Sequence, residues 1–288
     1  MHSVGQSSAQ IRARRVKNDL FQALVFFLGF MVVVPFLIVL YHVIRNGIRV
    51  INFEFLFHLP KPVGESGGGI VNAILGTLTV IIIAMIFSVP LGVTTGVYVA
   101  EARRSSRLAP ISRLSVDILQ SVPSIVIGIV MYTWIVVPLR SFSAFAGGIA
   151  LAIMMIPVIV KSTEETVKLV PNTLKEASMA LGAPYHKTIL RVVIPTGLSG
   201  IMSGVTLAVA RVAGETAPLL FTAFGNPFFN YNPFGPVSAI PLVIYDYAKS
   251  PYTSWISMAW GASFVLIVLV LILNVVVRLV KFARKSLQ

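Results

Sequence analysis

The chain has 288 residues, of which 56% are hydrophobic and 11% charged, and its mean hydropathy is +0.88. Soluble domains carry about a quarter charged residues, so this composition excludes a soluble enzyme and predicts an all-α integral membrane protein. The absence of cysteine excludes disulfides, thiolate metal sites and cysteine nucleophiles. The net charge of +13 is spread over several loops instead of clustering on one soluble face, so we expect no nucleic-acid partner.

Six apolar runs are long enough to cross a bilayer, whose core of about 30 Å needs about 20 helical residues. They cover residues 20–44, 70–100, 114–139, 146–160, 195–224 and 255–277. The fourth run is the shortest and could extend through residues 161–167. The first follows a basic stretch but exceeds the 7–15 apolar residues, roughly, of a cleavable signal peptide, so we interpret it as a retained anchor.

The distribution of lysine and arginine predicts the orientation in the membrane. Most of the 23 basic residues fall in the N-terminal tail (1–19), in the loops after the second and fourth runs, and around the C-terminal tail (283–288). Because basic loops stay in the cytoplasm, we expect both termini there and residues 45–69 outside. Residues 70–282 then form one transmembrane domain of five helices, with a cytoplasmic loop at about 161–195. Anionic lipid headgroups are a general partner for such basic loops.

Two outer segments lack obvious catalytic groups. Residues 64–69 are rich in glycine but do not end in the Gly-Lys-Ser/Thr of a phosphate-binding P-loop, so we interpret them as a flexible linker. Residues 226–229 and 232–234 repeat a turn followed by aromatic side chains. We favour an interfacial aromatic belt for this repeat, and a docking surface for an external protein is the alternative.

The most informative segment is residues 171–184, which predicts a short helix with both ends encoded. Thr173 and Glu176 have capping-box spacing, in which each side chain satisfies a free backbone N–H. Gly182 suits the left-handed position after the last turn, and Pro184 suits the first position of a second short helix.

This short helix has a small apolar face formed by Ala177, Ala180 and Leu181. A helix of this length is marginal by itself, so the face indicates that a groove of a partner protein buries it. The alternative is an ordinary interfacial helix that lies on the inner leaflet, but that alternative does not explain the glycine and the glutamate at these offsets.

The same segment resembles the loop shared by permease subunits of ABC importers. That loop reads Glu-Ala-Ala, then Gly, then an apolar residue and Pro; this chain has Glu176-Ala177-Ser178, Gly182 and Ile194-Pro195. In the family the loop docks into a cytoplasmic ATPase subunit, and Ser178 is a small-for-small change that should leave docking intact. The resemblance implies ATPase-coupling roles for Glu176, Ala177, Ser178, Ala180, Leu181 and Gly182.

The fifth apolar run contains two charged residues, Arg211 and Glu215, whose spacing places them on one face if the helix is continuous. Each such charge costs about 2.5–3.5 kcal/mol to insert into the membrane, so a structural or functional role must offset the cost of the pair. One hypothesis is a self-neutralising structural pair. We favour the second, in which Arg211 meets an anionic substrate and Glu215 helps to hold and release it, although the two hypotheses are compatible.

Small residues recur along the same run at Gly200, Gly204 and Ala208. This spacing is typical of transmembrane helices that approach one another closely. We expect this stripe to pack against a second permease bundle, which would place the helix near the translocation pathway.

Three stretches resemble the PstA-type permeases of bacterial phosphate importers. They are residues 210–223, residues 122–126 with Gly128, and residues 68–70 leading to Gly76-Thr77. The resemblance implies the type I ABC importer permease fold in the bacterial cytoplasmic membrane, and it implies that Arg211 and Glu215 are intramembrane pathway charges. Lys161 lies where the family can have arginine, so it is either a phosphate contact or a snorkelling anchor at the inner face.

The resemblance also implies the partners. They are a second permease of the PstC type in a heterodimer, a cytoplasmic ATPase dimer of the PstB type and an extracytoplasmic phosphate-binding protein of the PstS type. ATP and Mg²⁺ would be bound by the ATPase, and we expect no cofactor and no ATPase site in this chain, which has no Walker A sequence.

We therefore predict the membrane-spanning subunit of an ATP-driven importer of inorganic phosphate. Three alternatives stay open at this point. The first is an ABC importer permease for another oxyanion, such as sulfate or molybdate. The second is an ion-gradient-driven anion transporter or channel, and the third is a membrane scaffold that transports nothing.

Overall fold

The computed structural model describes residues 8–62, 65, 67–102 and 106–285. The ends of both predicted tails and the basic residues Arg103 and Arg104 lie outside the described residues. Within the described part the chain is helical, and its β structure is limited to an isolated bridge between Phe224 and Val237. The all-α prediction is confirmed.

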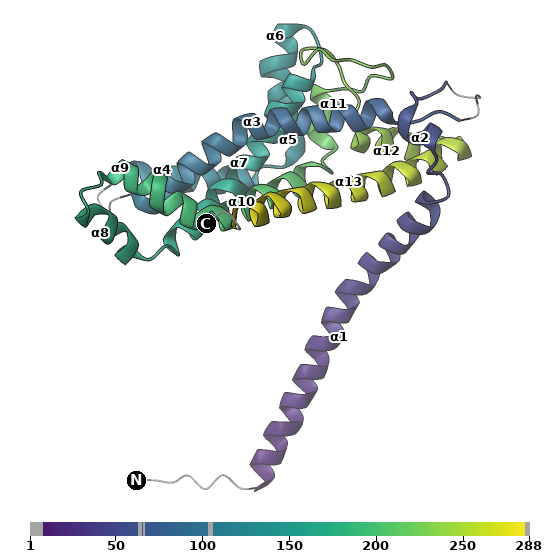
Figure 1. The fold of residues 1–288 in the computed structure, drawn as a ribbon. Helices are drawn as coiled ribbons and strands as arrows, with labels where there is room; N and C mark the ends of the chain where they lie inside the picture. The colour runs from purple at the N-terminus through teal and green to yellow at the C-terminus, as the bar shows by residue number, and fades with distance from the viewer. Residues whose placement is uncertain (1–7, 63–64, 66, 103–105, 286–288) are drawn as a thin grey trace.

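Long helices make up most of the described chain (Figure 1). They are α1 (Ser8–Gly47), α3 (Val71–Glu101), α4 (Leu108–Ser121), α7 (Ala144–Lys168), α10 (Ile194–Val212) and α13 (Thr253–Lys285). Short helices connect them: α2 (Phe53–Phe57), α5 (Ser124–Met131), α6 (Val137–Leu139), α8 (Asn172–Ala180), α9 (Tyr185–Thr188), α11 (Ala217–Thr222) and α12 (Ile240–Ala248). In the described residues, five helical stretches are long and apolar enough to cross a membrane, or six if one bent pair is a single span.

The core is built on α7, which packs against α3 along its length and against α10 on another side. Small residues allow these helices to approach closely. Gly92 of α3 faces Ile159, and Gly96 of α3 faces Thr163 and the Val160 carbonyl. The predicted extension of the fourth run is also confirmed, because α7 continues to Lys168.

Close packing at the outer end of α3 gives a testable consequence. A Cβ atom at Gly76 would overlap the carbonyl oxygen of Ser238, where the chain is fixed by a 2.8 Å hydrogen bond from the Ile240 N–H to Thr77 Oγ1. We expect Gly76→Ala to lower the stability by about 1–3 kcal/mol, the usual cost of overpacking. Thermal unfolding in detergent measures this loss, with Gly29→Ala as the control because a Cβ there meets nothing within 4 Å. Equal melting temperatures for the two variants would contradict the packing argument.

The third predicted run, residues 114–139, is not one straight helix. α4 begins earlier, at Leu108, and the path bends by 100° between Ser121 and Ser124. Pro123 explains the break, because a residue before proline avoids the helical region and Val122 has an extended ψ of 128°. α4 itself is amphipathic, with apolar side chains exposed at Leu108, Ile111, Leu114 and Ile118.

The prediction that the fifth run, residues 195–224, forms one continuous helix is also wrong. α10 ends at Val212, residues 213–216 form a turn, and α11 follows with Pro218 in its first turn. Gly214 disfavours helix, and Pro218 lacks the N–H that a helix interior needs, which accounts for the interruption.

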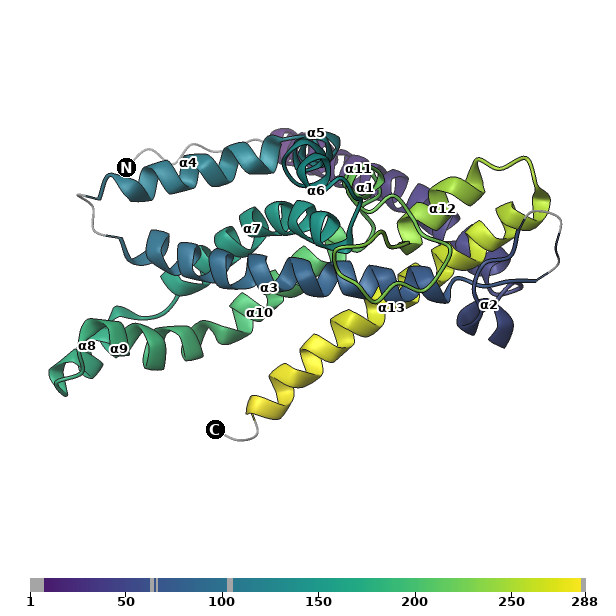
Figure 2. The same cartoon turned by 90° about the horizontal axis from the view of Figure 1, so that it is seen from above.

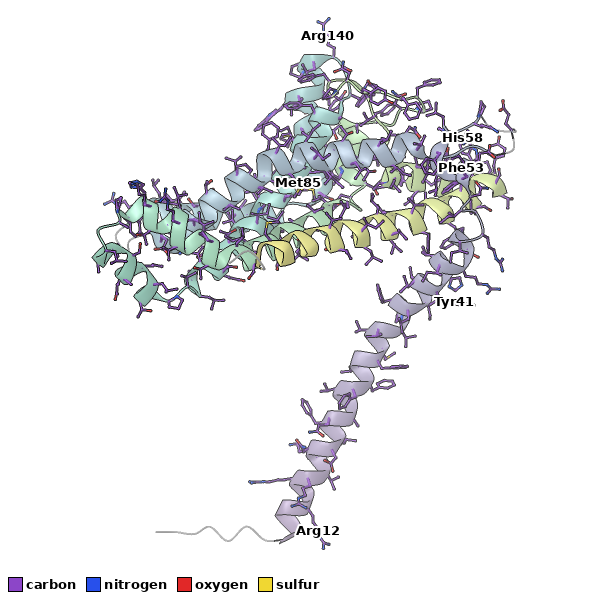
Figure 3. The ribbon with its side chains drawn as sticks, viewed as in Figure 1. Arg12, Tyr41, Phe53, His58, Met85 and Arg140 are labelled. Atoms are coloured by element: carbon purple, nitrogen blue, oxygen red, sulfur yellow. The ribbon has the colours of Figure 1, made fainter. Side chains whose placement is uncertain are left out.

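The first predicted span lies within α1, which projects away from the bundle (Figure 1). The C-terminal end of α1 is the part that contacts α13. From Leu20 to Phe30 its described side chains are exposed, and the sticks project on all sides of the helix (Figure 3). α1 therefore offers an apolar surface that the rest of the chain leaves uncovered.

After α1, the chain is anchored at α2 by Glu54. The Glu54 carboxylate accepts a 3.0 Å hydrogen bond from Lys61 and a 3.1 Å bond from the Gly68 N–H, and these lower the pKa of Glu54 below its ordinary value. Gly67 and Gly68 have φ of 84° and 95°, a conformation that glycine adopts readily. Gly68 of the glycine-rich stretch is thus held to α2 by a hydrogen bond, a contact that the linker interpretation did not include.

Candidate translocation and coupling sites

The predicted coupling helix is α8, and it projects with α9 beyond one end of the bundle (Figures 1 and 2). Its C-terminal signal is confirmed: Gly182 has φ of 83°, its N–H donates to the Met179 carbonyl at 2.9 Å, and the Ala183 N–H donates to the Ser178 carbonyl at 3.2 Å. This is the Schellman arrangement that ends a helix at glycine.

The predicted capping box at the N-terminus of α8 is wrong. The N-cap is Pro171 and forms no side-chain capping bond, so the capping box of Thr173 and Glu176 does not exist. Because the helix begins earlier than the box requires, Glu176 lies in the second turn instead of at the third position. Pro184 is likewise the N-cap of α9, one residue before the predicted first position.

The coupling residues divide between two sides of α8. Ala177, Ala180 and Leu181 are exposed, with Leu181 at 90%, and Glu176 is also exposed. Ser178 instead faces the following segment, where its hydroxyl is hydrogen-bonded to that of Thr188 at 3.0 Å. The outer face of α8 is therefore uncovered in this subunit, as a partner-binding helix requires.

Arg211 lies in the last turn of α10 on an exposed stripe of that helix. The other exposed positions on this stripe are Pro195, Ser199, Ser203 and Leu207, each four residues from the next. The Ser203 hydroxyl donates to the Ser199 carbonyl at 2.8 Å, so it needs no partner outside the helix. A charged side chain is costly against lipid, so Arg211 on this stripe indicates a neighbour other than lipid tails. A cation at a helix C-terminus also interacts favourably with the helix dipole.

Glu215 does not share this face. It lies past the end of α10, in the turn before α11, and it is partly buried. The ion pairs of the described residues include none between Arg211 and Glu215. The expectation of two charges on one helical face is wrong because the helix stops between them, and their roles in transport remain predictions.

The small-residue stripe packs inside the subunit. A Cβ at Gly200 would overlap the Thr166 side chain, a Cβ at Gly204 would overlap Ser162, and Ala208 is fully buried. The expectation that Gly200, Gly204 and Ala208 meet a second bundle is therefore wrong. Their neighbour is α7 of the same chain, since α7 and α10 form a close antiparallel pair.

Lys161 of α7 forms an ion pair with Asp117 of α4 at 2.8 Å, and both side chains are largely exposed. Nearby, Glu164 accepts from Arg113 at 2.9 Å and from Lys168 at 2.6 Å. The Lys161–Asp117 and Arg113–Glu164 pairs attach the amphipathic α4 to α7, which sequence reasoning missed. Arg113 and Asp117 are one helical turn apart on α4, a spacing that could have indicated a polar face.

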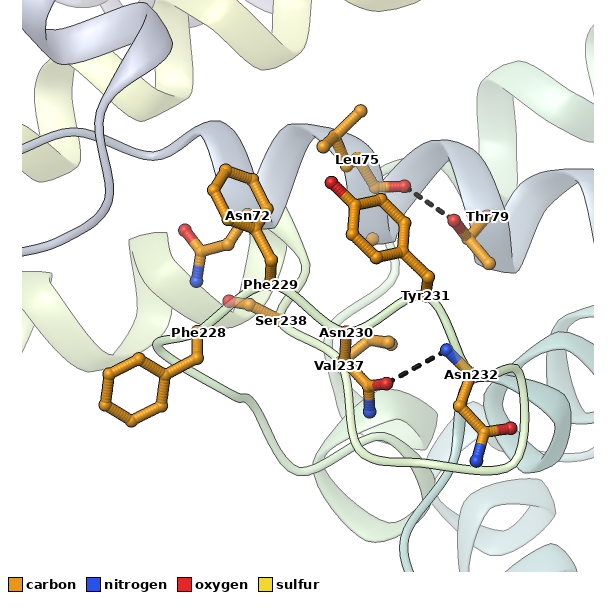
Figure 4. Close-up of a pocket in the computed structure, with 11 residues that line it drawn as sticks. Asn72, Leu75, Thr79, Phe228, Phe229, Asn230, Tyr231, Asn232, Val237 and Ser238 are labelled. Atoms are coloured by element: carbon orange, nitrogen blue, oxygen red, sulfur yellow. Dashed lines mark hydrogen bonds between the residues drawn. The ribbon is translucent and has the colours of Figure 1, made fainter.

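The aromatic segment at residues 226–234 is ordered by side-chain amides. Asn226, Asn230 and Asn232 each accept a hydrogen bond from a backbone N–H two residues later, at 2.9–3.0 Å. The segment and α3 enclose a pocket of about 140 Å³, lined by residues that include Asn72, Phe229 and Tyr231 (Figure 4). No lining residue carries a charge, so the pocket offers no counter-ion to an anion.

Residues 92–285 match the family described as binding-protein-dependent transport system inner membrane component. The phosphate transport system permease protein PstA of Haemophilus influenzae is 42% identical over 241 residues, 84% of this chain and 85% of that protein. The chain belongs to the PstA family. Its PstA relatives in Yersinia pestis and Mycobacterium leprae are each 39% identical, over 86% and 91% of this chain and 84% and 87% of theirs.

The fold of this PstA family member agrees with solved ABC transporters. An inward-facing structure of the MetNI methionine ABC transporter superposes with a TM-score of 0.64 at 21% identity, covering 74% of this chain and 95% of that one. The prediction of an ABC importer permease fold of type I is confirmed. The chain is a multi-pass membrane protein of this class.

Proposed function

We propose that this chain is the membrane-spanning subunit of an ATP-driven importer that moves inorganic phosphate across the bacterial cytoplasmic membrane. Phosphate as the substrate is supported by the PstA relatives, which this chain matches over most of their length. The observation that carries the translocation role is the exposed stripe of α10, which presents Arg211 from within an apolar span.

Arg211 is the phosphate contact in this proposal. A guanidinium carries donors in a planar fork, stays charged at all physiological pH values and binds tetrahedral oxyanions with two hydrogen bonds. Glu215 lies a few residues beyond it in a separate turn and carries the opposite charge. Its repulsion of phosphate would favour release, whereas Lys161 is held by Asp117 and serves as an inner-face anchor.

Three partners complete this proposal, and the uncovered surfaces of the subunit support places for them. A second permease of the PstC type covers the exposed stripe of α10, because the Arg211 guanidinium needs a protein or aqueous neighbour. An ATPase dimer of the PstB type, with its ATP and Mg²⁺, receives the exposed face of α8. A PstS-type binding protein delivers phosphate at the opposite end, which contains α2 and α12 (Figure 2).

The test is uptake of radiolabelled phosphate into vesicles that contain the co-expressed complex, with and without internal ATP. We expect uptake to require ATP and to resist excess sulfate and molybdate. Competition by either oxyanion would favour an importer of that anion. Uptake that an ion gradient drives without ATP would refute the ATPase-coupled function.

A further inference from the structure

The carboxylate of Glu101 joins two segments that lie far from it in sequence. Glu101 is the last residue of α3, and its Oε1 forms an ion pair with Lys175 of α8. Its other oxygen, Oε2, accepts a 2.7 Å hydrogen bond from the hydroxyl of Tyr185, the first residue of α9. Both carboxylate oxygens are therefore used by the segment that contains the coupling helix.

This contact is shielded from solvent, unlike the rest of α8. The side chains of Lys175 and Glu101 are 12% and 14% exposed, whereas the other residues of α8, apart from Ser178, are exposed. Ion pairs on an open surface contribute little, but removal of one partner from a shielded pair leaves a charge without compensation. The Lys175–Glu101 pair is therefore the contact at which α8 is most sensitive to a change of charge.

The pair also connects α8 to the membrane-spanning core. α8 packs on α9 and on the π-helical turn η2 (Ile189–Val193). The hydrogen bond of Ser178 goes to Thr188 of α9, so it does not connect α8 to α3. Among the described residues, the polar contact between α8 and α3 is the Lys175–Glu101 pair. α3 in turn packs along α7, so Glu101 belongs to a helix that runs from the α8 segment into the centre of the bundle.

We propose that Glu101 is a positioning residue that transmits movement of α8 to α3 by holding Lys175 and Tyr185. The proposal rests on the proposed function, in which α8 receives the ATPase. Glu101 touches neither nucleotide nor phosphate in this scheme. Its loss should separate ATP hydrolysis from transport while the ATPase stays bound.

The experiment compares ATP hydrolysed with phosphate delivered by the whole complex in proteoliposomes. Glu101→Gln keeps the size of the side chain and an acceptor for Tyr185 but removes the charge. We expect hydrolysis to continue and phosphate delivered per ATP to fall about tenfold, within the usual range of coupling between sites. Exchange of the charges, Glu101→Lys with Lys175→Glu, should restore most of the ratio, which would assign the effect to the Lys175–Glu101 pair.

Two controls identify the cause. Glu165→Gln removes an exposed carboxylate of α7 that forms no ion pair among the described residues, and it should keep the wild-type ratio. Leu181→Arg places a charge on the exposed face of α8 and should release the ATPase during purification.

A wild-type ratio in Glu101→Gln, with the ATPase lost in Leu181→Arg, would overturn the role of Glu101 and leave the proposed function intact. If Leu181→Arg keeps both the ATPase and uptake, α8 is not the docking helix and both proposals fail. Should Glu101→Gln fail to assemble, Lys175→Met breaks the same pair from the α8 side, and a wild-type ratio there would overturn the proposal.

Discussion

Replacement of Arg211 by alanine is expected to abolish phosphate uptake in a complex that still assembles. The side chain is exposed on α10 and pairs with no carboxylate among the described residues, so the fold of the subunit does not depend on it. Each hydrogen bond to a charged group contributes about 1.5–3 kcal/mol. Loss of a two-bond contact should therefore reduce uptake by at least about 100-fold.

The measurement is initial uptake of radiolabelled phosphate, normalised to assembled complex. Arg140→Ala is the matched control, because Arg140 is also exposed but caps α6 at the outer edge of the molecule (Figure 3). Arg211→Lys should keep partial uptake, since lysine retains the charge and loses the fork. A complex that fails to assemble with Arg211→Ala would favour a structural role for Arg211, and wild-type uptake would exclude it from the pathway.

Substitution of Gly182 by valine is expected to uncouple ATP hydrolysis from transport. Gly182 has φ of 83°, and a Cβ there would meet nothing within 4 Å. The effect must then come from the backbone, because a β-branched residue does not adopt the left-handed conformation readily. Strain of this kind costs about 1–3 kcal/mol, enough to displace a short helix end such as that of α8.

Asparagine at the same position separates conformation from side-chain size. Asn tolerates the left-handed region, so Gly182→Asn should keep most of the phosphate delivered per ATP, whereas Gly182→Val should lose it. Both variants are assayed for ATP turnover and uptake in proteoliposomes. Normal transport with normal turnover in Gly182→Val would refute the coupling role of this helix end.

Local signals in the sequence predicted the parts of the fold that depend on neighbouring residues. Apolar length predicted the spans within α1, α3, α7 and α13, and Gly182 predicted the left-handed end of α8. These features follow from hydropathy and backbone sterics, which act over a few residues.

The interruptions and the packing partners depend on distant contacts. Pro123 and Gly214 lie within apolar runs, and membrane helices often tolerate proline and glycine, so hydropathy alone suggested continuous spans. The stripe of Gly200 and Gly204 indicated close approach but not which helix approaches, and the structure places α7 there. The contact between Glu101 and Lys175 spans more than 70 residues of sequence, and no local spacing encodes it.

The two interruptions of the spans have a mechanical consequence, because they lie together. α5 follows the break at Pro123, α11 follows the break after Val212, and the two short helices pack on each other, with Gly128 against Pro218. α3 and α10, in contrast, each pack on α7 through glycines that allow a close approach. The two breaks therefore share one contact, so a change at Gly128 acts on both interrupted spans at once.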